Sequence, residues 1–353
     1  MTTLTNIRLQ QFRSYNDASF EFSPKVNIIV GPNASGKTNL LEAILVVARG
    51  GSYRVRDADL VHFGQPWARL DAYVADELRT VKLVNEPEPG KTYELGGRVF
   101  KRLTLEHMLP VVLFEPNHLV LLTGSPERRR DYLDELLQQI QPGYGVVVRS
   151  YRRALAQRNR LLKTAHVAKD HLFPWDVRLS ELGAVIARSR LQLANSINET
   201  IGGLYRDLSR STTDVAVSYR IAVDPQDYES VMLRELELRV RQDLLRGFTS
   251  FGPHREDFSA AFNGREAGDV ASRGETRTLV LGLKIVELQL LEARRDKAPL
   301  LLLDDVFSEL DGRRREALTA HLNQYQTFIT TTDADVVTHH FTAHSAIIPI
   351  EKS

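Results

Sequence analysis

The chain has 353 residues and a formal net charge of +1, and 42% of its residues are hydrophobic and 26% charged. These values are typical of a globular protein of about two domains. The absence of cysteine excludes disulfides, thiolate nucleophiles and cysteine-ligated metal sites. The sequence has neither the long apolar run of a membrane span nor a signal peptide, so we expect a cytoplasmic protein with no membrane partner.

The first third of the chain predicts strands around one helix. A glycine-rich turn near residue 31 separates a buried strand from a helix expected over 37–47. Turn signals at 86–90 and 96–97 divide the residues after 68 into short strands, which predicts an antiparallel meander. The expected strands are 4–9, 18–22, 26–30 and several within 68–105.

The middle of the chain is helical by pattern, with apolar residues at helical spacing. One strand is expected near 215–223, and Gly202-Gly203 predicts a kink in the third helix. The expected helices are 131–140, 151–162, 180–208 and 228–245. From Phe258 the mixture of strands and helices returns. We therefore divide the chain into an N-terminal part of an ATPase lobe (1–123), a helical insertion (124–247) and a C-terminal part of the same lobe (248–353).

A phosphate-binding loop follows the buried strand at 26–30. Its glycines allow backbone N–H groups to surround phosphate oxygens, and the helix N-terminus adds positive potential. Lys37 would reach the β- and γ-phosphates of ATP, and the Thr38 hydroxyl would coordinate Mg²⁺. The motif consists of Gly31, Pro32, Asn33, Ala34, Ser35, Gly36, Lys37 and Thr38.

A second acidic element follows the apolar run 300–303. Because the carboxyl ends of parallel strands meet at one edge of a sheet, Asp304 and Asp305 are expected beside the phosphates. Asp304 would help to hold Mg²⁺, and Asp305 would orient or deprotonate the attacking water. A plain helix cap at the end of a buried strand is the alternative.

A third element, residues 271–275, precedes an apolar helix and resembles the signature of ABC-type ATPases. Ser272, Gly274 and Glu275 retain it, whereas Ala271 and Arg273 depart from it. A helix start of this kind offers a hydroxyl and backbone N–H groups to a γ-phosphate. Ser272 and Glu275 also have the spacing of a capping box, and both interpretations are compatible.

Five blocks in this order resemble the RecF family, whose ATPase head is related to those of Smc and Rad50. The last block is close to identical to the family's form. The blocks are Phe12 to Tyr15, Gly31 to Ile44, Gly124 to Asp134, Gly252 to Asp257 and Leu300 to Asp311. The position after the last core strand reads Thr330 to Asp333, where many ABC proteins have histidine.

The resemblance implies an α/β fold: an ABC-type P-loop ATPase head, with mixed sheets around a P-loop helix and a mainly helical inserted lobe. It implies a cytoplasmic recombination mediator that binds ATP, Mg²⁺ and gapped DNA in DNA repair, replication and the SOS response to DNA damage. Its expected partners are RecR, with RecO and RecA in the pathway. In relatives the signature contacts nucleotide held by the opposite subunit, so an ATP-dependent homodimer is expected, with slow, DNA-stimulated ATP hydrolysis as a switch and no chemistry on DNA.

Basic residues gather at helical spacing in the middle of the chain. A positive helix face can bind phosphates without reading sequence. A solvated face paired with acids elsewhere is the alternative. The candidate DNA contacts are Arg149, Arg152, Arg153, Arg160 and Lys163.

Two other functions are alternatives for a chain with this phosphate-binding loop. The ATPase subunit of an ABC-type membrane transporter would share the P-loop, but such a subunit usually has a complete signature, a switch histidine and a shorter insertion. A nuclease fused to the ATPase would need a further acidic metal cluster.

Overall fold

The computed structural model describes residues 3–164, 169–221, 223–322, 324–333, 337 and 345–351. The chain forms two compact units, the first made of Met1–Leu119 and Lys284–Ser353 and the second of Val120–Leu283. The second unit begins before the predicted insertion and includes residues 248–283, which the sequence analysis assigned to the ATPase lobe. The reason is strand pairing, because β10 (Asp257–Phe262) joins β9 (Val215–Arg220) in the second unit's sheet.

The first unit contains a six-stranded antiparallel sheet in the order β2-β1-β4-β5-β6-β7. The predicted meander is confirmed, because β4 to β7 pair in succession. Alternating burial along β4 shows that one face of the sheet covers the core. The strands are β1 (Leu4–Phe12), β2 (Tyr15–Glu21), β4 (Trp67–Val74), β5 (Glu77–Val84), β6 (Gly90–Leu95) and β7 (Arg98–Phe100).

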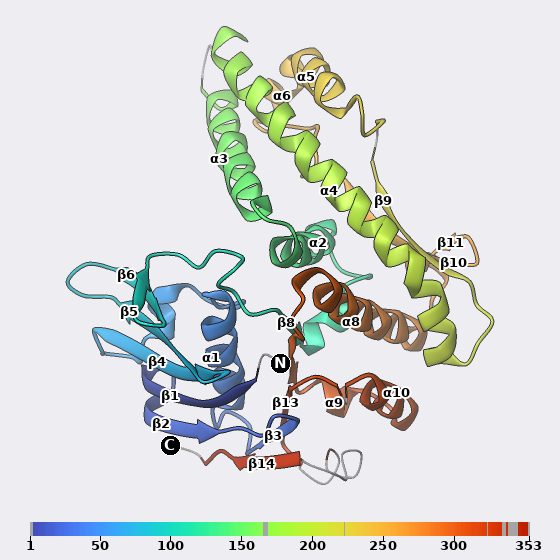
Figure 1. Cartoon of the computed structure of the whole chain (residues 1–353). Coiled ribbons are helices and arrows are strands. Elements are labelled where there is room, and N and C mark those ends of the chain that lie inside the picture. The colour runs from blue at the N-terminus through green and yellow to red at the C-terminus, as the bar shows by residue number, and fades with distance from the viewer. Residues whose placement is uncertain are drawn as a thin grey trace. The chain divides into compact units, whose positions relative to one another are not determined.

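The same unit contains a five-stranded parallel sheet in the order β14-β3-β13-β12-β8. Strands β3, β8 and β12 are buried along almost their whole length, as their apolar runs predict, whereas the edge strand β14 is partly exposed. Helix α1 (Lys37–Arg49) packs between this sheet and the antiparallel one, and is drawn in blue in Figure 1. The strands are β3 (Val26–Val30), β8 (Val111–Phe114), β12 (Leu300–Asp304), β13 (Thr327–Thr331) and β14 (Ser345–Pro349); the short helices are η1 (Asp57–Leu60), η2 (Pro116–Val120), α9 (Val306–Glu309) and α10 (Gly312–Leu322).

The second unit is mainly helical, with β9, β10 and β11 (Arg265–Glu266) forming a small antiparallel sheet. Helix α4 packs against α3, α5 and β9, and its pairing with α3 is visible in green in Figure 1. The division between the units falls within α8. The helices are α2 (Pro126–Ile140), α3 (Tyr144–Leu162), α4 (Lys169–Ser209), α5 (Tyr228–Leu238), α6 (Val240–Arg246), α7 (Ala267–Val270) and α8 (Arg273–Arg295).

Two helix predictions differ from the structure. At Gly202-Gly203, where a kink was expected, α4 is not interrupted and continues through both glycines to Ser209. A Cβ on Gly202 would lie 3.1 Å from the carbonyl oxygen of Val215, so this glycine permits close approach of a neighbouring segment instead. The helix expected over 228–245 is divided at Arg239, which leaves helical geometry with φ −87° and ψ 0°. Among the described residues, no helix combines the length and apolar character that a membrane span requires.

Candidate nucleotide-binding site

The loop between β3 and α1 has the backbone geometry of a phosphate cradle. Gly36 has φ 106° and Ala34 has φ 63°, both in the left-handed region that a glycine adopts without cost. A Cβ on Gly31 would collide with the carbonyl oxygen of Ile350, so only glycine fits there. The loop delivers its final residues to the first turn of α1, where backbone N–H groups have no partner within the helix.

Two side chains of the loop fit a phosphate ligand. Lys37 is only 5% exposed, and its ammonium group donates to the carbonyl oxygens of Gly31 at 2.8 Å and Pro32 at 3.0 Å. The buried hydroxyl of Ser35 has no hydrogen-bond partner among the described residues. A buried donor left unsatisfied is costly, and a phosphate oxygen would satisfy both groups.

The ends of β12 and β13 bring a carboxylate to this loop. The hydroxyl groups of Thr38 and Thr330 each donate to Asp304 Oδ1 at 2.9 Å. The Tyr53 hydroxyl donates to Asp304 Oδ2 at 3.3 Å. A threonine hydroxyl beside an aspartate supplies the oxygen donors that Mg²⁺ prefers, so Thr38 and Asp304 fit the predicted metal site.

Asp305 follows in a left-handed conformation with φ 53°. Its backbone N–H donates to the Thr330 hydroxyl at 2.9 Å, which fixes this turn. Burial, together with the negative charge of Asp304, raises the pKa of Asp305, although Lys37 opposes the shift. A carboxylate with a raised pKa is a better proton acceptor than an ordinary aspartate.

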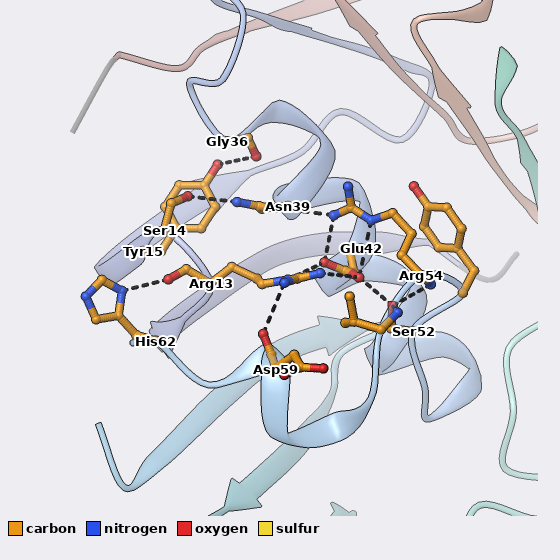
Figure 2. A network of polar contacts seen from close by, with 12 residues as sticks. Arg13, Ser14, Tyr15, Gly36, Asn39, Glu42, Ser52, Arg54, Asp59 and His62 are labelled. Atoms are coloured by element: carbon orange, nitrogen blue, oxygen red, sulfur yellow. Dashed lines mark hydrogen bonds and ion pairs between the residues drawn. The ribbon is translucent and has the colours of Figure 1, made fainter. Parts of the chain in front are cut away.

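A buried ion-pair network holds α1 in place (Figure 2). Glu42 is fully buried and accepts from Arg13 at 2.7 Å and from Arg54 at 2.8 Å. Burial opposes ionisation of Glu42, but the hydrogen bonds from the two arginines lower its pKa overall. The Tyr15 hydroxyl donates to the Gly36 carbonyl at 3.0 Å. The block at Phe12 to Tyr15 therefore positions the phosphate loop.

A cavity of about 560 Å³ lies beside the first turn of α1. Ser14, Asn39 and His62 line it, together with Phe63. The Phe63 side chain is 97% exposed, which is unusual for a large apolar residue. An aromatic ring and amide groups beside a phosphate loop are chemically suited to a nucleotide base.

The signature segment forms the capping box. The backbone N–H of Ser272 donates to Glu275 Oε2 at 2.8 Å, and that of Glu275 donates to the Ser272 hydroxyl at 3.2 Å. These bonds lower the pKa of Glu275. Ser272 is exposed, and Gly274 lies in the first turn of α8. The segment belongs to the second unit, whereas the phosphate loop belongs to the first.

The five candidate DNA contacts all lie on or directly after α3, with exposed side chains. Arg152 pairs with Asp131 at 3.1 Å. The other four have no carboxylate within 4 Å in the part of the chain described; they are Arg149, Arg153, Arg160 and Lys163. The neighbouring Arg158 is different, because it is fully buried against Asp176 and Asp243.

Tyr53 and Thr330 contact Asp304 and were not among the predicted site residues. Thr330 carried a usable signal, because it opens the segment Thr330 to Asp333 at which many ABC proteins have histidine; in the structure it lies one residue before the end of β13. Tyr53 carried no sequence signal, because its place beside Asp304 depends on how the segment after α1 folds back.

The chain is similar to known proteins over almost its whole length. Residues 3–350 match the family model of the RecF/RecN/SMC N-terminal domain. The DNA replication and repair protein RecF of Heliobacterium modesticaldum is 37% identical over 341 residues, covering 92% of this chain and 91% of that protein.

Two solved structures are also similar. A structure of the recombination mediator protein RecF-ATP in the RecFOR pathway aligns with a TM-score of 0.83 and 29% identity, covering 94% of this chain and 92% of that one. An Smc head bound to the C-winged helix domain of ScpA aligns with a TM-score of 0.53 and 16% identity, over 96% of this chain and 92% of that one. The latter likeness concerns the fold alone.

Proposed function

The chain belongs to the RecF family, and from this premise we propose that it is an ATP-switched, DNA-binding recombination mediator. One observation carries the proposal: the phosphate loop, Thr38, Asp304 and Asp305 meet at one edge of the parallel sheet. The similarity to RecF proteins over almost the whole chain supports the role in repair. No feature of the site favours a transporter subunit.

Each residue of the site has a defined role in this proposal. Lys37 leaves its carbonyl contacts for the β- and γ-phosphates, and Ser35 donates to a phosphate oxygen. Thr38 and Asp304 hold Mg²⁺, which when bound neutralises charge on the phosphates. Asp305 accepts the proton of the attacking water. Phe63 and Asn39 flank the base.

Assembly supplies the rest of the site. One chain has one phosphate loop and one signature segment, so a two-fold dimer would place Ser272, Gly274 and Glu275 of each copy against nucleotide on the other. ATP would then drive dimer formation because its γ-phosphate contacts both subunits, and hydrolysis would release it. The closed dimer would hold gapped DNA through the α3 face and present it, in the cytoplasm, to RecR, RecO and RecA.

ATP-dependent binding to gapped DNA tests the proposal. Lys37→Met should lower ATP affinity by about 100-fold and abolish the ATP-dependent part of DNA binding, because the charge facing the phosphates is lost. Lys82→Met, an exposed lysine on β5, is the matched control. ATP affinity unchanged in Lys37→Met would refute the assignment of the phosphate loop.

Sedimentation with ATP and Mg²⁺ tests the dimer separately. Ser272→Arg leaves the phosphate loop intact, so the monomer should bind ATP normally, yet the added bulk and charge should block the dimer. Ser272→Thr retains the hydroxyl and the cap and is the control. A normal ATP-dependent dimer of Ser272→Arg would show that the segment is only a capped helix start.

A further inference from the structure

Two of the sequence blocks have no role in nucleotide binding, and they meet in the second unit. Arg129 at the start of α2 pairs with Asp257 at 2.7 Å. Arg130 donates to the backbone carbonyl oxygen of Glu256 at 2.8 Å. Segments more than 120 residues apart are thus joined, and residues from both blocks line a half-open cavity of about 490 Å³.

The buried polar groups that line this cavity already have partners within the protein. Asp134 and Arg190, both buried, form two hydrogen bonds of 2.8 and 2.9 Å. The two ring nitrogens of His254 contact the Tyr151 hydroxyl at 2.6 Å and the Thr249 carbonyl at 3.1 Å. Burial lowers the pKa of His254 to about 4, so the ring is neutral at neutral pH. These groups shape the cavity without needing a ligand.

The mouth of the cavity is different, because two arginines there lack a carboxylate. Arg130 comes from α2 and Arg255 from the turn before β10, and both line the cavity. The Arg255 guanidinium donates to the Thr249 carbonyl and lies over the Phe248 ring at 4.7 Å. Neither arginine has an acidic group within 4 Å among the described residues. Backbone carbonyls orient these guanidinium groups, and neither is held in a direct ion pair in the part of the chain described.

The basic face of α3 continues into this cavity. Arg152, one of the predicted DNA contacts, lines the cavity with its side chain 64% exposed. Its nearer partner Asp131, at 3.1 Å, is also exposed, at 46%, and the buried carboxylate of Asp134 lies at 3.9 Å, beyond hydrogen-bond distance, and is already bound by Arg190. An exposed pair such as Arg152–Asp131 contributes little free energy. Arg152 can therefore turn from Asp131 to an incoming anion. Three guanidinium groups from α2, α3 and the turn before β10 then face one space.

We propose that this cavity binds a phosphate group of the DNA backbone between Arg130, Arg152 and Arg255. Guanidinium groups match phosphate oxygens in geometry and charge, and arginine remains charged at any relevant pH. The assignment rests on the DNA-binding role proposed above and places one contact at a defined point, where the α3 face meets this cavity at Arg152. Such a contact positions the strand and reads no sequence.

Glu127 predicts a change in DNA affinity opposite in direction to that of the arginines. It is exposed in the first turn of α2 and lines the same cavity, so its carboxylate repels an incoming phosphate. Glu127→Gln should therefore strengthen DNA binding by about two- to threefold, whereas removing the arginines should weaken it. A role of these residues in folding alone would not reverse the sign in this way.

The test measures gapped-DNA affinity with ATP across a salt series. Arg130→Gln with Arg255→Gln should lower affinity about tenfold near 0.1 M salt and reduce the slope of log K against log salt by about 1 to 2. Arg130→Lys with Arg255→Lys should keep most of the slope. The matched control is Arg178→Gln with Arg234→Gln, two exposed arginines of the same unit outside the cavity.

The outcomes separate this proposal from the function on which it rests. If the unaltered protein does not bind DNA, the proposed function fails. If it binds DNA and the double glutamine variant retains the same affinity and slope with ATP binding intact, the cavity assignment fails. Titration with inorganic phosphate distinguishes a DNA phosphate from free phosphate as the ligand. If phosphate stabilises the protein only when both arginines are present, and the variants bind DNA as the unaltered protein does, the cavity is a site for free anions. That result would overturn the DNA contact.

Discussion

The phosphate loop of the first unit and the buried polar groups of the second differ in the partners that they give to charged side chains. Within the described part of the chain, the Lys37 ammonium group donates hydrogen bonds only to backbone carbonyls, and the Ser35 hydroxyl has no hydrogen-bond partner. In the second unit, Arg158 is bound by two aspartates, and Arg190 by Asp134.

The kind of partner that a buried charge has indicates whether the charge serves ligand binding or stability. A buried charge with an ionic partner is strongly destabilising to unpair, so the second unit uses its arginines to join helices. A charge held by carbonyls can move to a stronger acceptor, so the loop keeps its lysine available. Within the second unit, the same criterion, a carboxylate partner or a carbonyl partner, distinguishes Arg158 from Arg130 and Arg255.

The largest expected effect is on stability, and it concerns two arginines on α3. Arg158→Met leaves Asp176 and Asp243 without their partner, and should lower the free energy of unfolding by about 3 to 5 kcal/mol. Arg160→Met removes an exposed arginine and should change it by less than about 0.5 kcal/mol. Urea unfolding followed by Trp175 fluorescence in a Trp67→Phe background reports on the second unit. An equal loss of unfolding free energy in the two variants would show that burial of Arg158 does not distinguish it from Arg160.

The second effect is on catalysis at the nucleotide edge. Asp305→Asn retains the shape of the side chain but removes the proton acceptor, so ATP hydrolysis should fall about 100-fold or more while ATP still binds. Because the pKa of Asp305 is raised, the acid limb of the wild-type rate should lie above the pH at which an ordinary aspartate titrates. Asp296→Asn, an exposed aspartate directly after α8 that makes no contact with Asp304 or Asp305 in the described structure, is the control. Loss of ATP binding equal to that of Lys37→Met would mean that Asp305 has another role.

The third effect is a pH dependence of the second unit. The pKa of His254 is about 4 in the folded protein, below its ordinary value of 6.5, so the unfolded chain binds more protons between these values. Stability contributed by neutral His254 is present above pH 6.5 and is lost as pH falls toward 4, by about 2 kcal/mol at pH 5. His254→Gln should reduce this dependence, whereas His171→Gln, an exposed histidine of the same unit, should not. An unchanged pH profile in His254→Gln would show that the ring is not the group that titrates.

The smallest effect concerns the exposed face of α3. Arg149→Gln with Arg153→Gln removes two arginines that have no carboxylate partner in the described structure and do not line the cavity. DNA affinity should fall about 3- to 10-fold with a reduced salt slope. Thermal stability should stay within about 0.5 kcal/mol of wild type. An unaltered slope would leave α3 as a solvated face and move the DNA surface elsewhere.

The sequence by itself determined the elements whose cause is local. The glycines of the phosphate loop, the apolar runs of β3 and β12, and the carboxylates at 304–305 are adjacent to the features that explain them. Strand order follows in part, because parallel strands with buried runs must bring their carboxyl ends to one edge. The capping box at Ser272 is likewise a matter of four neighbouring residues.

Only the tertiary structure decided which charges are buried. Arg158 and Arg160 are two residues apart and chemically identical, yet α3 turns one toward Asp176 and Asp243 and the other toward solvent. The extent of the second unit was decided in the same way, by the pairing of β9 with β10, in which Arg220 and Asp257 lie opposite each other although they are 37 positions apart in the sequence. Both depend on contacts between distant segments, because the free energy of burying a charge is set by the groups that surround it and not by its neighbours in sequence.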